Sequence, residues 1–157
     1  MAEIIYQTVN FHFMVGFNFE PGSTTDIRFQ AVSGLDSAID TDTVKEGGEN
    51  RFEHVVPVRR KYGPLVLKRG LIKPEHSGLT RWLKTAFDDE TVNPIPTVNI
   101  HLLNEKQKTL MHWTVSNVWP RSWRLGELNA EQGAVLIETL ELNYNTLLFD
   151  NPLSDAN

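Results

Sequence analysis

The stretch Phe11-His12-Phe13-Met14-Val15-Gly16-Phe17-Asn18-Phe19 carries an apolar side chain at every second position. Because the side chains of a strand point alternately to its two faces, this period predicts a half-buried strand with Phe13 and Phe17 in the core. Pro21-Gly22-Ser23 then supplies turn residues, and a second alternating segment runs from Asp26 to Val32. The two segments predict an antiparallel hairpin.

The same succession of alternating segments and turns continues along most of the chain. Further strands are expected within residues 51–57, 65–72, 98–102, 110–118 and 135–148. In the last of these Leu140 and Leu142 share a face, which places them in the core, and a change of phase before them predicts a bulge. With about seven strands, mostly in hairpins, the expected fold is mainly β, an antiparallel β-barrel or two-sheet sandwich with one flanking helix.

That helix is expected over about residues 76–87. Its apolar side chains recur at helical spacing, at Leu79, Trp82, Leu83, Ala86 and Phe87. The acidic run 88–90 would be unfavourable in a last turn, so the helix should end near Phe87. Trp82 and Phe87 are expected in the core, and Trp119 and Trp123 are interpreted mainly as packing residues at a sheet edge.

Length and composition bound the class of protein. The chain has 157 residues, which at about 100–200 residues per domain predicts one domain over 1–157, with a frayed tail at 150–157. A net charge of −5 gives no general attraction to nucleic acid, and the lack of cysteine excludes disulfides, thiolate metal sites and cysteine nucleophiles. The first residues lack a basic region followed by an apolar run, so we expect no secretory signal and synthesis in the cytoplasm.

No set of residues in the sequence predicts catalysis or a cofactor. None of the five histidines lies two or four positions from another, although His101 and His112 could face each other across a hairpin as two polar positions on an outer face. Glu138 and Glu141 are three apart in a predicted strand and should point to opposite faces. We therefore expect no enzyme, no metal and no cofactor.

Two blocks of charge stand out. Residues 36–53 hold six acidic and two basic residues, a net charge of −4, and residues 54–84 hold eight basic and one acidic, a net charge of +7. The first block could be an exposed loop or a long hairpin arm. The blocks could be two solvated faces, or the acidic block of one copy could meet the basic block of the next in a heterologous contact. Aromatic residues are not interleaved in the basic block as in binders of single-stranded nucleic acid.

Three groups of segments together resemble a known family. They are Val32-Ser33-Gly34-Leu35; then Lys45 to Asn50 continuing through Lys61-Tyr62-Gly63-Pro64 to Gly70; then Asn117 to Trp123 with Leu128-Asn129-Ala130 and Ile137 to Leu142. In this order and spacing the chain resembles the inner tube proteins of contractile-tailed phages and contractile injection systems, which include the antifeeding prophage and the Photorhabdus virulence cassettes. It is more distantly similar to the Hcp protein of type VI secretion.

The resemblance implies a structural role. Six copies would form a ring whose sheets join into one inner β-barrel, and rings would stack into a tube inside a contractile sheath. The implied partners are further copies of the chain, the sheath protein, baseplate and tube-terminating proteins and cargo in the lumen, with nucleic acid only if a phage tail conducts DNA. The alternatives are a tube-like adaptor ring of the baseplate and an Hcp-like exported ring that carries cargo. The protein would be made in the cytoplasm and assembled into a phage-tail-like particle, either released or anchored to a membrane.

The arm at about 36–53 resembles the family's extended loop that reaches neighbouring subunits, and Gly47-Gly48 would supply positive backbone angles to it. Val58 stands where family members commonly have glycine. The residues expected at subunit contacts are Asp40, Asp42, Lys45, Glu46, Gly47, Gly48, Glu49, Asn50, Arg59, Arg60, Lys61, Tyr62, Lys68 and Arg69. A cargo-binding ring and a small β-barrel enzyme are the other function classes considered, and the second has no supporting residues.

Overall fold

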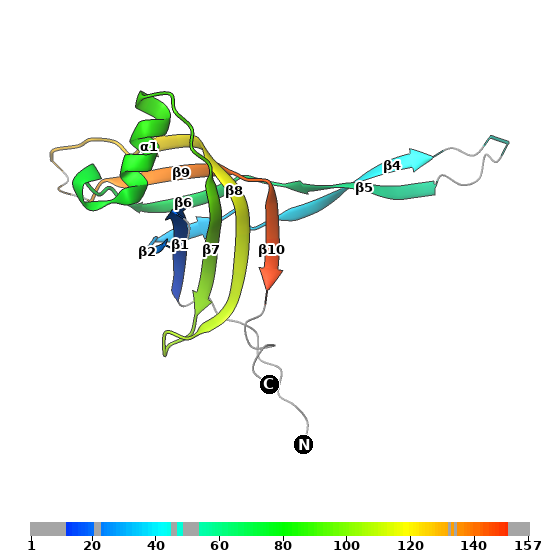
Figure 1. The fold of residues 1–157 in the computed structure, drawn as a ribbon, viewed down its shortest axis with the longest axis horizontal. Coiled ribbons are helices and arrows are strands. Elements are labelled where there is room, and N and C mark those ends of the chain that lie inside the picture. Colours follow the sequence, from blue (N-terminus) through cyan, green and yellow to red (C-terminus); the bar gives the residue numbers. More distant parts are fainter. Residues whose placement is uncertain are drawn as a thin grey trace, which may run out of the picture.

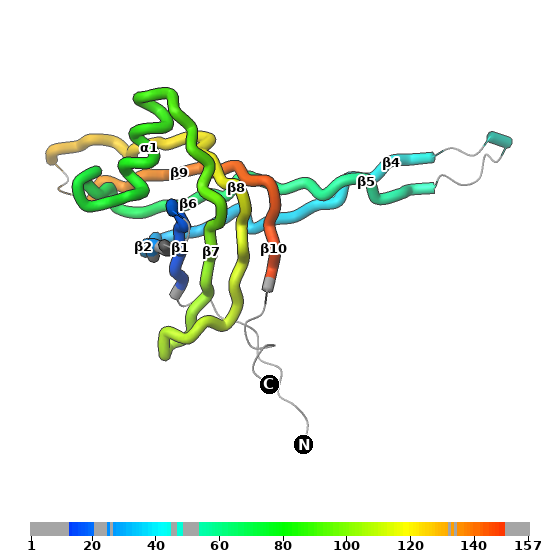
Figure 2. The backbone as a smooth tube through the Cα atoms, in the orientation of Figure 1, coloured from blue at the N-terminus to red at the C-terminus, as the bar shows by residue number. Residues whose placement is uncertain are grey.

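The computed structural model describes residues 12–20, 23–44, 47–48, 54–131, 133 and 135–150. In chain order its elements are β1 (His12–Glu20), β2 (Ser23–Ile27), β3 (Ala31–Ser33), β4 (Ser37–Val44), β5 (His54–Tyr62), β6 (Leu65–Gly70), a 3-10 turn (Pro74–His76), α1 (Gly78–Asp88), β7 (Ile95–Leu103), β8 (Thr109–Leu125), β9 (Ile137–Asn143) and β10 (Thr146–Asp150). Figure 1 shows a body of strands and one helix, from which β4 and β5 project as a long arm. Figure 2 traces the same path in the backbone.

The body is built around β8, the longest strand. The strand order is β2-β1-β7-β8-β9-β6-β3, and β10 also pairs with β8. The first part of β8 pairs with β7 on one side and β10 on the other, whereas its last part pairs with β9. Near the change of partners Asn117 has a φ of 52°, and the register with β9 shifts between Pro120 and Ser122, within the last part. β8 thus passes from one layer to the other through these irregularities, which change strand direction.

The hydrophobic core lies between the two layers. Val15 and Phe17 of β1, Leu67 of β6 and Leu140 and Leu142 of β9 are fully or almost fully buried. The helix α1 adds Leu79 and Leu83 to the same cluster. All the sheets are antiparallel, so the expectation of a mainly β fold with two packed sheets and one flanking helix is confirmed.

Two expected strands are each divided in the structure. The segment 26–32 splits into β2, which pairs with β1, and β3, which pairs with β6 in the other layer. The segment 135–148 splits into β9 and β10, both alongside β8. With β4, which lies in the segment expected to be an exposed loop or a hairpin arm, the described residues form ten strands rather than about seven. The expectation of one continuous strand is wrong in both places, because each segment passes from one layer of the body to the other.

Gly34 joins the body to the arm at a position where a residue with a side chain does not fit. Its φ is +85°, and a Cβ built on it would lie 2.0 Å from the carbonyl oxygen of Pro64. Residues with a side chain rarely adopt that φ. The clash would also be hard to relieve, because the Pro64 carbonyl belongs to the backbone. The sequence Ser33-Gly34-Leu35 therefore lets the chain pass close to the start of β6.

Candidate assembly surfaces

The arm is a two-stranded sheet made only of β4 and β5. The pairing runs from Ser37 with Tyr62 at its base to Val44 with His54 toward its tip. The register shifts between Ile39 and Thr41, where β5 carries one more residue than β4. Val58 of β5 lies in this bulge.

Almost every side chain of the arm is exposed. All eight residues of β4 and the first eight of β5 are exposed, and only Tyr62 at the base is partly buried. The exposed aliphatic side chains include Ile39 (60% exposed) and Val55 (62%), together with Val44, Val56 and Val58. An isolated two-stranded hairpin is at best marginally stable in water. The arm therefore presents apolar area that a single subunit leaves uncovered.

The expected acidic and basic blocks meet on this one arm. Asp40 and Asp42 lie on β4, and Arg59, Arg60 and Lys61 lie on β5. Lys61 Nζ is 3.9 Å from Asp40 Oδ1, so one acid and one base of the two blocks face each other within the subunit. The picture of an acidic arm and a separate basic strip is thus wrong: the arm extends to Tyr62 and carries both signs.

The base of the arm is anchored to the body by two tyrosines. The rings of Tyr62 and Tyr144 are 5.7 Å apart, and the Tyr144 hydroxyl donates a hydrogen bond to the Gly63 carbonyl at 2.8 Å. Burial raises the pKa of Tyr144 above its usual 10.0, and the nearby Asp36 and Tyr62 raise it further. The phenol stays protonated and keeps donating this bond at neutral pH.

Arg69 and Lys68, the second half of the expected basic strip, lie in the body on β6. Lys68 is exposed, but Arg69 is only 3% exposed and forms an ion pair with Glu138 of β9. The interface assignment of Arg69 is therefore wrong, because its charge is neutralised inside the subunit.

The partners of this ion pair form one closed polar network. Arg69 Nη2 donates to Ser77 Oγ at 3.1 Å and to Thr80 Oγ1 at 2.9 Å, and Trp123 Nε1 donates to Glu138 Oε2 at 2.9 Å. Ser77 also caps α1 by accepting from the Thr80 amide. The network fixes the start of the helix on the β6–β9 layer.

The other expected contact residues fall partly outside the described chain. Lys45, Glu46, Glu49 and Asn50 lie outside the described residues. Gly47 and Gly48 form a turn, in which Gly48 has a φ of +101° but Gly47 has no positive φ. The expectation that both glycines have a positive φ is thus wrong for Gly47.

The expected core residues differ in depth. Phe17, Leu140 and Leu142 are buried, whereas Phe13, Trp82 and Trp123 are partly buried against the core and Trp119 is half-buried. Phe87 is 41% exposed and stacks on Trp123. Its assignment to the core is therefore wrong, because Leu79, Leu83 and Ala86 form the buried stripe of α1 and the Phe87 ring lies at the surface against Trp123.

In the layer that runs from β2 through β1, β7 and β8 to β10, the two outermost strands each have an edge with no neighbouring strand among the described residues. The layer β2-β1-β7-β8 ends at β2 on one side, and β10 borders the other side of β8. Within the described residues each of these strands pairs with a single neighbour. Unpaired edges can accept a strand from another chain, and Leu148 and Phe149 of β10 are also exposed.

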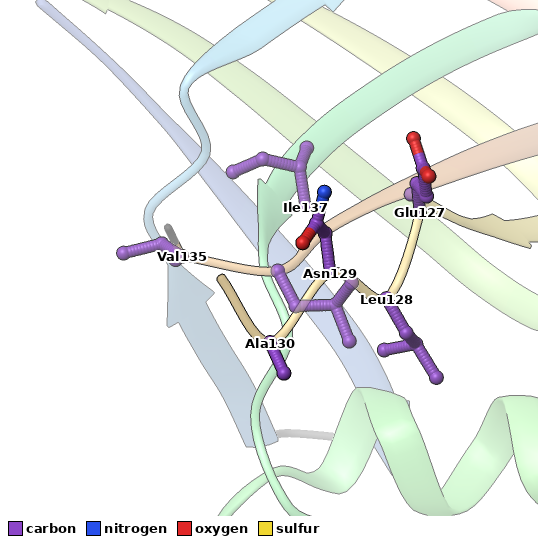
Figure 3. Close-up of a pocket in the computed structure, with 8 residues that line it drawn as sticks. Glu127, Leu128, Asn129, Ala130, Val135 and Ile137 are labelled. Carbon is purple, nitrogen blue, oxygen red and sulfur yellow. The ribbon is translucent and has the colours of Figure 1, made fainter. Parts of the chain in front are cut away.

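A pocket of about 520 Å³ lies at the end of the body away from the arm. Its walls are the segments 126–130 and 135–137. One backbone hydrogen bond joins the two segments, from Gly126 N to Ile137 O at 2.9 Å, and another attaches the second segment to Leu71, from Leu71 N to Leu136 O at 2.8 Å. Figure 3 shows the two segments side by side, with Leu128 and Val135 projecting from opposite sides. These side chains are 81% and 72% exposed.

The outer face of the β1-β7-β8 layer carries a histidine pair. His101 and His112 are register partners, and their rings stack with centroids 5.5 Å apart, as expected from the hairpin. Glu138 and Glu141 point to opposite faces of β9, because Glu138 is buried with Arg69 while Glu141 pairs with Arg124. In the part of the chain that the structure describes, no cluster of three or more metal-ligating residues is present, and no helix has the length and apolar character needed to cross a membrane.

The described residues thus form a body of two antiparallel layers with open edges and one helix, from which an exposed arm projects. The chain belongs to the family described as T4-like virus tail tube protein gp19, whose model matches residues 9–148. It is a tube-like protein related to components of contractile injection systems, and the family is one of structural tube proteins. Comparison with curated proteins finds no match.

Solved structures agree with this assignment. A chain in the cryo-EM structure of the anti-feeding prophage baseplate, 6-fold symmetrised, is 33% identical, with a TM-score of 0.83 over 94% of this chain and 98% of that one. A chain of the PVC sheath–tube complex in the extended state is 23% identical, with a TM-score of 0.74 over 93% of each chain. An Hcp protein shares the fold at 11% identity, with a TM-score of 0.58 over 90% of this chain and 94% of that one.

Proposed function

We propose that this chain is a structural subunit of the inner tube of a contractile injection system. Six copies form a ring, rings stack into a hollow tube, and contraction of a surrounding sheath drives the tube through a target envelope. The observation that carries the proposal is the arm, whose two strands have almost no buried side chain in one subunit.

An arm of this kind supports assembly for an energetic reason. Burial of apolar surface contributes roughly 25 cal/mol per Å², and the arm's five exposed aliphatic side chains gain none of this in isolation. A hairpin needs a third strand or a packing surface to be stable. A neighbouring subunit of the same tube supplies that surface.

The two open edges support closure of the ring. If β2 of one copy meets β10 of the next, the layers of six subunits continue into one sheet that closes on itself. Closure removes the edges, which would otherwise invite aggregation. The partners of the tube would be the sheath protein, baseplate proteins and a tube terminator, and cargo would travel in the lumen of a phage-tail-like particle.

A second role within the same assembly is a ring at the baseplate. It is favoured by the higher identity to the chain in the baseplate structure, 33% against 23% for the chain in the sheath–tube complex. In this role the protein would form single rings on a baseplate and would not polymerise by itself.

Electron microscopy of the purified protein, with its mass from light scattering, tests both roles. Sixfold rings stacked into tubes would support the repeating tube, and single sixfold rings would support the baseplate ring. A dispersed monomer at all concentrations, even when baseplate proteins are added, would overturn both. The matched variant is Ile39→Asp with Val55→Asp, which should stay folded and lose assembly.

A further inference from the structure

The geometry points to a specific receptor for the arm. We propose that the arm of one copy docks its apolar face into the pocket between segments 126–130 and 135–137 of another copy. This inference rests on the proposed function and deepens it, because it names the surface that the arm occupies.

The apolar face of the arm is defined by the register of β4 and β5. Thr41 pairs with Pro57 and Thr43 pairs with Val55, while Ile39 pairs with Arg60 beyond the bulge. Paired residues and every second residue along a strand share a face, so Ile39, Pro57 and Val55 lie on one side. The opposite face carries Val44 and Val56 as well, but Asp40, Asp42 and Lys61 lie among them, and these charges make it the worse partner for an apolar pocket.

The pocket offers apolar side chains that match this face of the arm. Leu128 and Val135 expose large aliphatic side chains beside it, and Leu136 and Ile137 complete its wall. Val135 lies over β6, since a Cβ on Gly70 would be 3.1 Å from its Cγ1. A partner that covers these exposed aliphatic side chains removes apolar surface from water, which favours docking.

Charge favours the same pairing. Arg60 lies on the apolar face of the arm. Within the described residues it makes no ion pair, and neither Glu127 nor Glu131 beside the pocket makes one. The nearby Arg124 is already engaged, because it bonds Glu141. An arm that brings Arg60 to Glu127 would pair two charges that one subunit leaves exposed.

The position of the two surfaces makes the occupant a second copy. The arm and the segments that line the pocket lie toward opposite ends of the molecule's longest axis (Figure 1), so an arm cannot reach the pocket of its own subunit. The nine residues of β5 span about 30 Å at about 3.3 Å per residue, enough to cross onto a neighbour. Such a contact is heterologous and repeats from copy to copy, as a ring or stack requires.

Because the chain has no cysteine, engineered cysteine pairs test this contact cleanly. In a Val55→Cys, Leu128→Cys double variant, mild oxidation of assembled protein should give a ladder of covalent dimers and higher multimers on a denaturing gel. The matched control is Val55→Cys with Lys106→Cys, which lies in the exposed β7–β8 turn and should give at least tenfold less crosslinked product.

A charge exchange provides the second readout. Arg60→Glu should weaken assembly, and adding Glu127→Arg to the same chain should restore it, as electron microscopy would show. Rings or tubes that form normally but give neither the Val55–Leu128 crosslink nor this rescue would overturn the docking and leave the tube function standing. Failure of the wild-type protein to assemble, even when baseplate proteins are added, would overturn both the docking and the tube function.

Discussion

The body and the arm hold their charges in opposite ways. In the body, Arg69 and Glu138 are buried together, and Ser77, Thr80 and Trp123 form further hydrogen bonds with the pair. On the arm, Asp40 and Lys61 are 3.9 Å apart and exposed to water. Breaking a buried ion pair costs about 3–5 kcal/mol, whereas an exposed pair contributes about 0–1 kcal/mol. The charges of the body therefore maintain the fold of one subunit, and those of the arm contribute little to it.

The largest effect should come from breaking the buried pair. Glu138→Ala leaves Arg69 buried without its carboxylate and removes the acceptor of Trp123. We expect the free energy of unfolding to fall by about 3–5 kcal/mol, measured by urea denaturation at concentrations where light scattering shows monomer.

The control removes both charges at once. Arg69→Met with Glu138→Leu replaces the pair by apolar side chains of similar size, and much of the lost stability should return. Equal losses in the single and double variants would contradict the idea that an uncompensated charge is the main cost.

Gly34 gives a smaller effect at the junction between body and arm. In Gly34→Ala the new Cβ meets both an unfavourable φ of +85° and the Pro64 carbonyl. A strained backbone position of this kind costs about 1–3 kcal/mol, which urea denaturation would detect. Gly63→Ala is the matched control, because no atom lies within 4 Å of its built Cβ, and it should be close to neutral. If both variants behave alike, the junction does not require glycine.

The same comparison explains what the sequence could and could not predict. The hairpins β1–β2 and β7–β8 follow from local alternation, and both were predicted. The role of Arg69 was not, because its partner Glu138 is 69 residues away and only the β6–β9 register brings them together. Because Arg69 lies among other basic residues in the sequence, nothing in its immediate sequence distinguishes it from an exposed arginine.

The extent of the arm was missed for a related reason. The sequence marks an acidic segment, but the register that extends β5 to Tyr62 depends on a bulge opposite Asp40, which alternation does not reveal. The basic residues 59–61 therefore fall on the arm itself. The pocket at 126–137 has no local signal either, since its walls come from segments on both sides of a loop.

Alkaline pH should loosen the base of the arm while the body stays folded. The pKa of Tyr144 is raised, so its neutral form stabilises the folded state below pH 10, and this contribution is lost as pH rises through the raised value. Tyrosinate absorbance of the wild type minus that of Tyr144→Phe should show this group titrating above 10.0. A midpoint at or below that value would contradict the buried hydrogen bond to Gly63.

The smallest effect should come from the exposed pair on the arm. Asp40→Asn removes one charge of the Lys61–Asp40 contact and keeps the shape of the side chain. Because water and salt screen an exposed pair, the free energy of unfolding should change by less than about 1 kcal/mol. The apolar face of the arm is on the other side of the hairpin, so assembly should also persist. A loss of stability comparable to that of Glu138→Ala would mean that the arm, like the body, depends on its charges to fold, and the contrast between the two regions would fail.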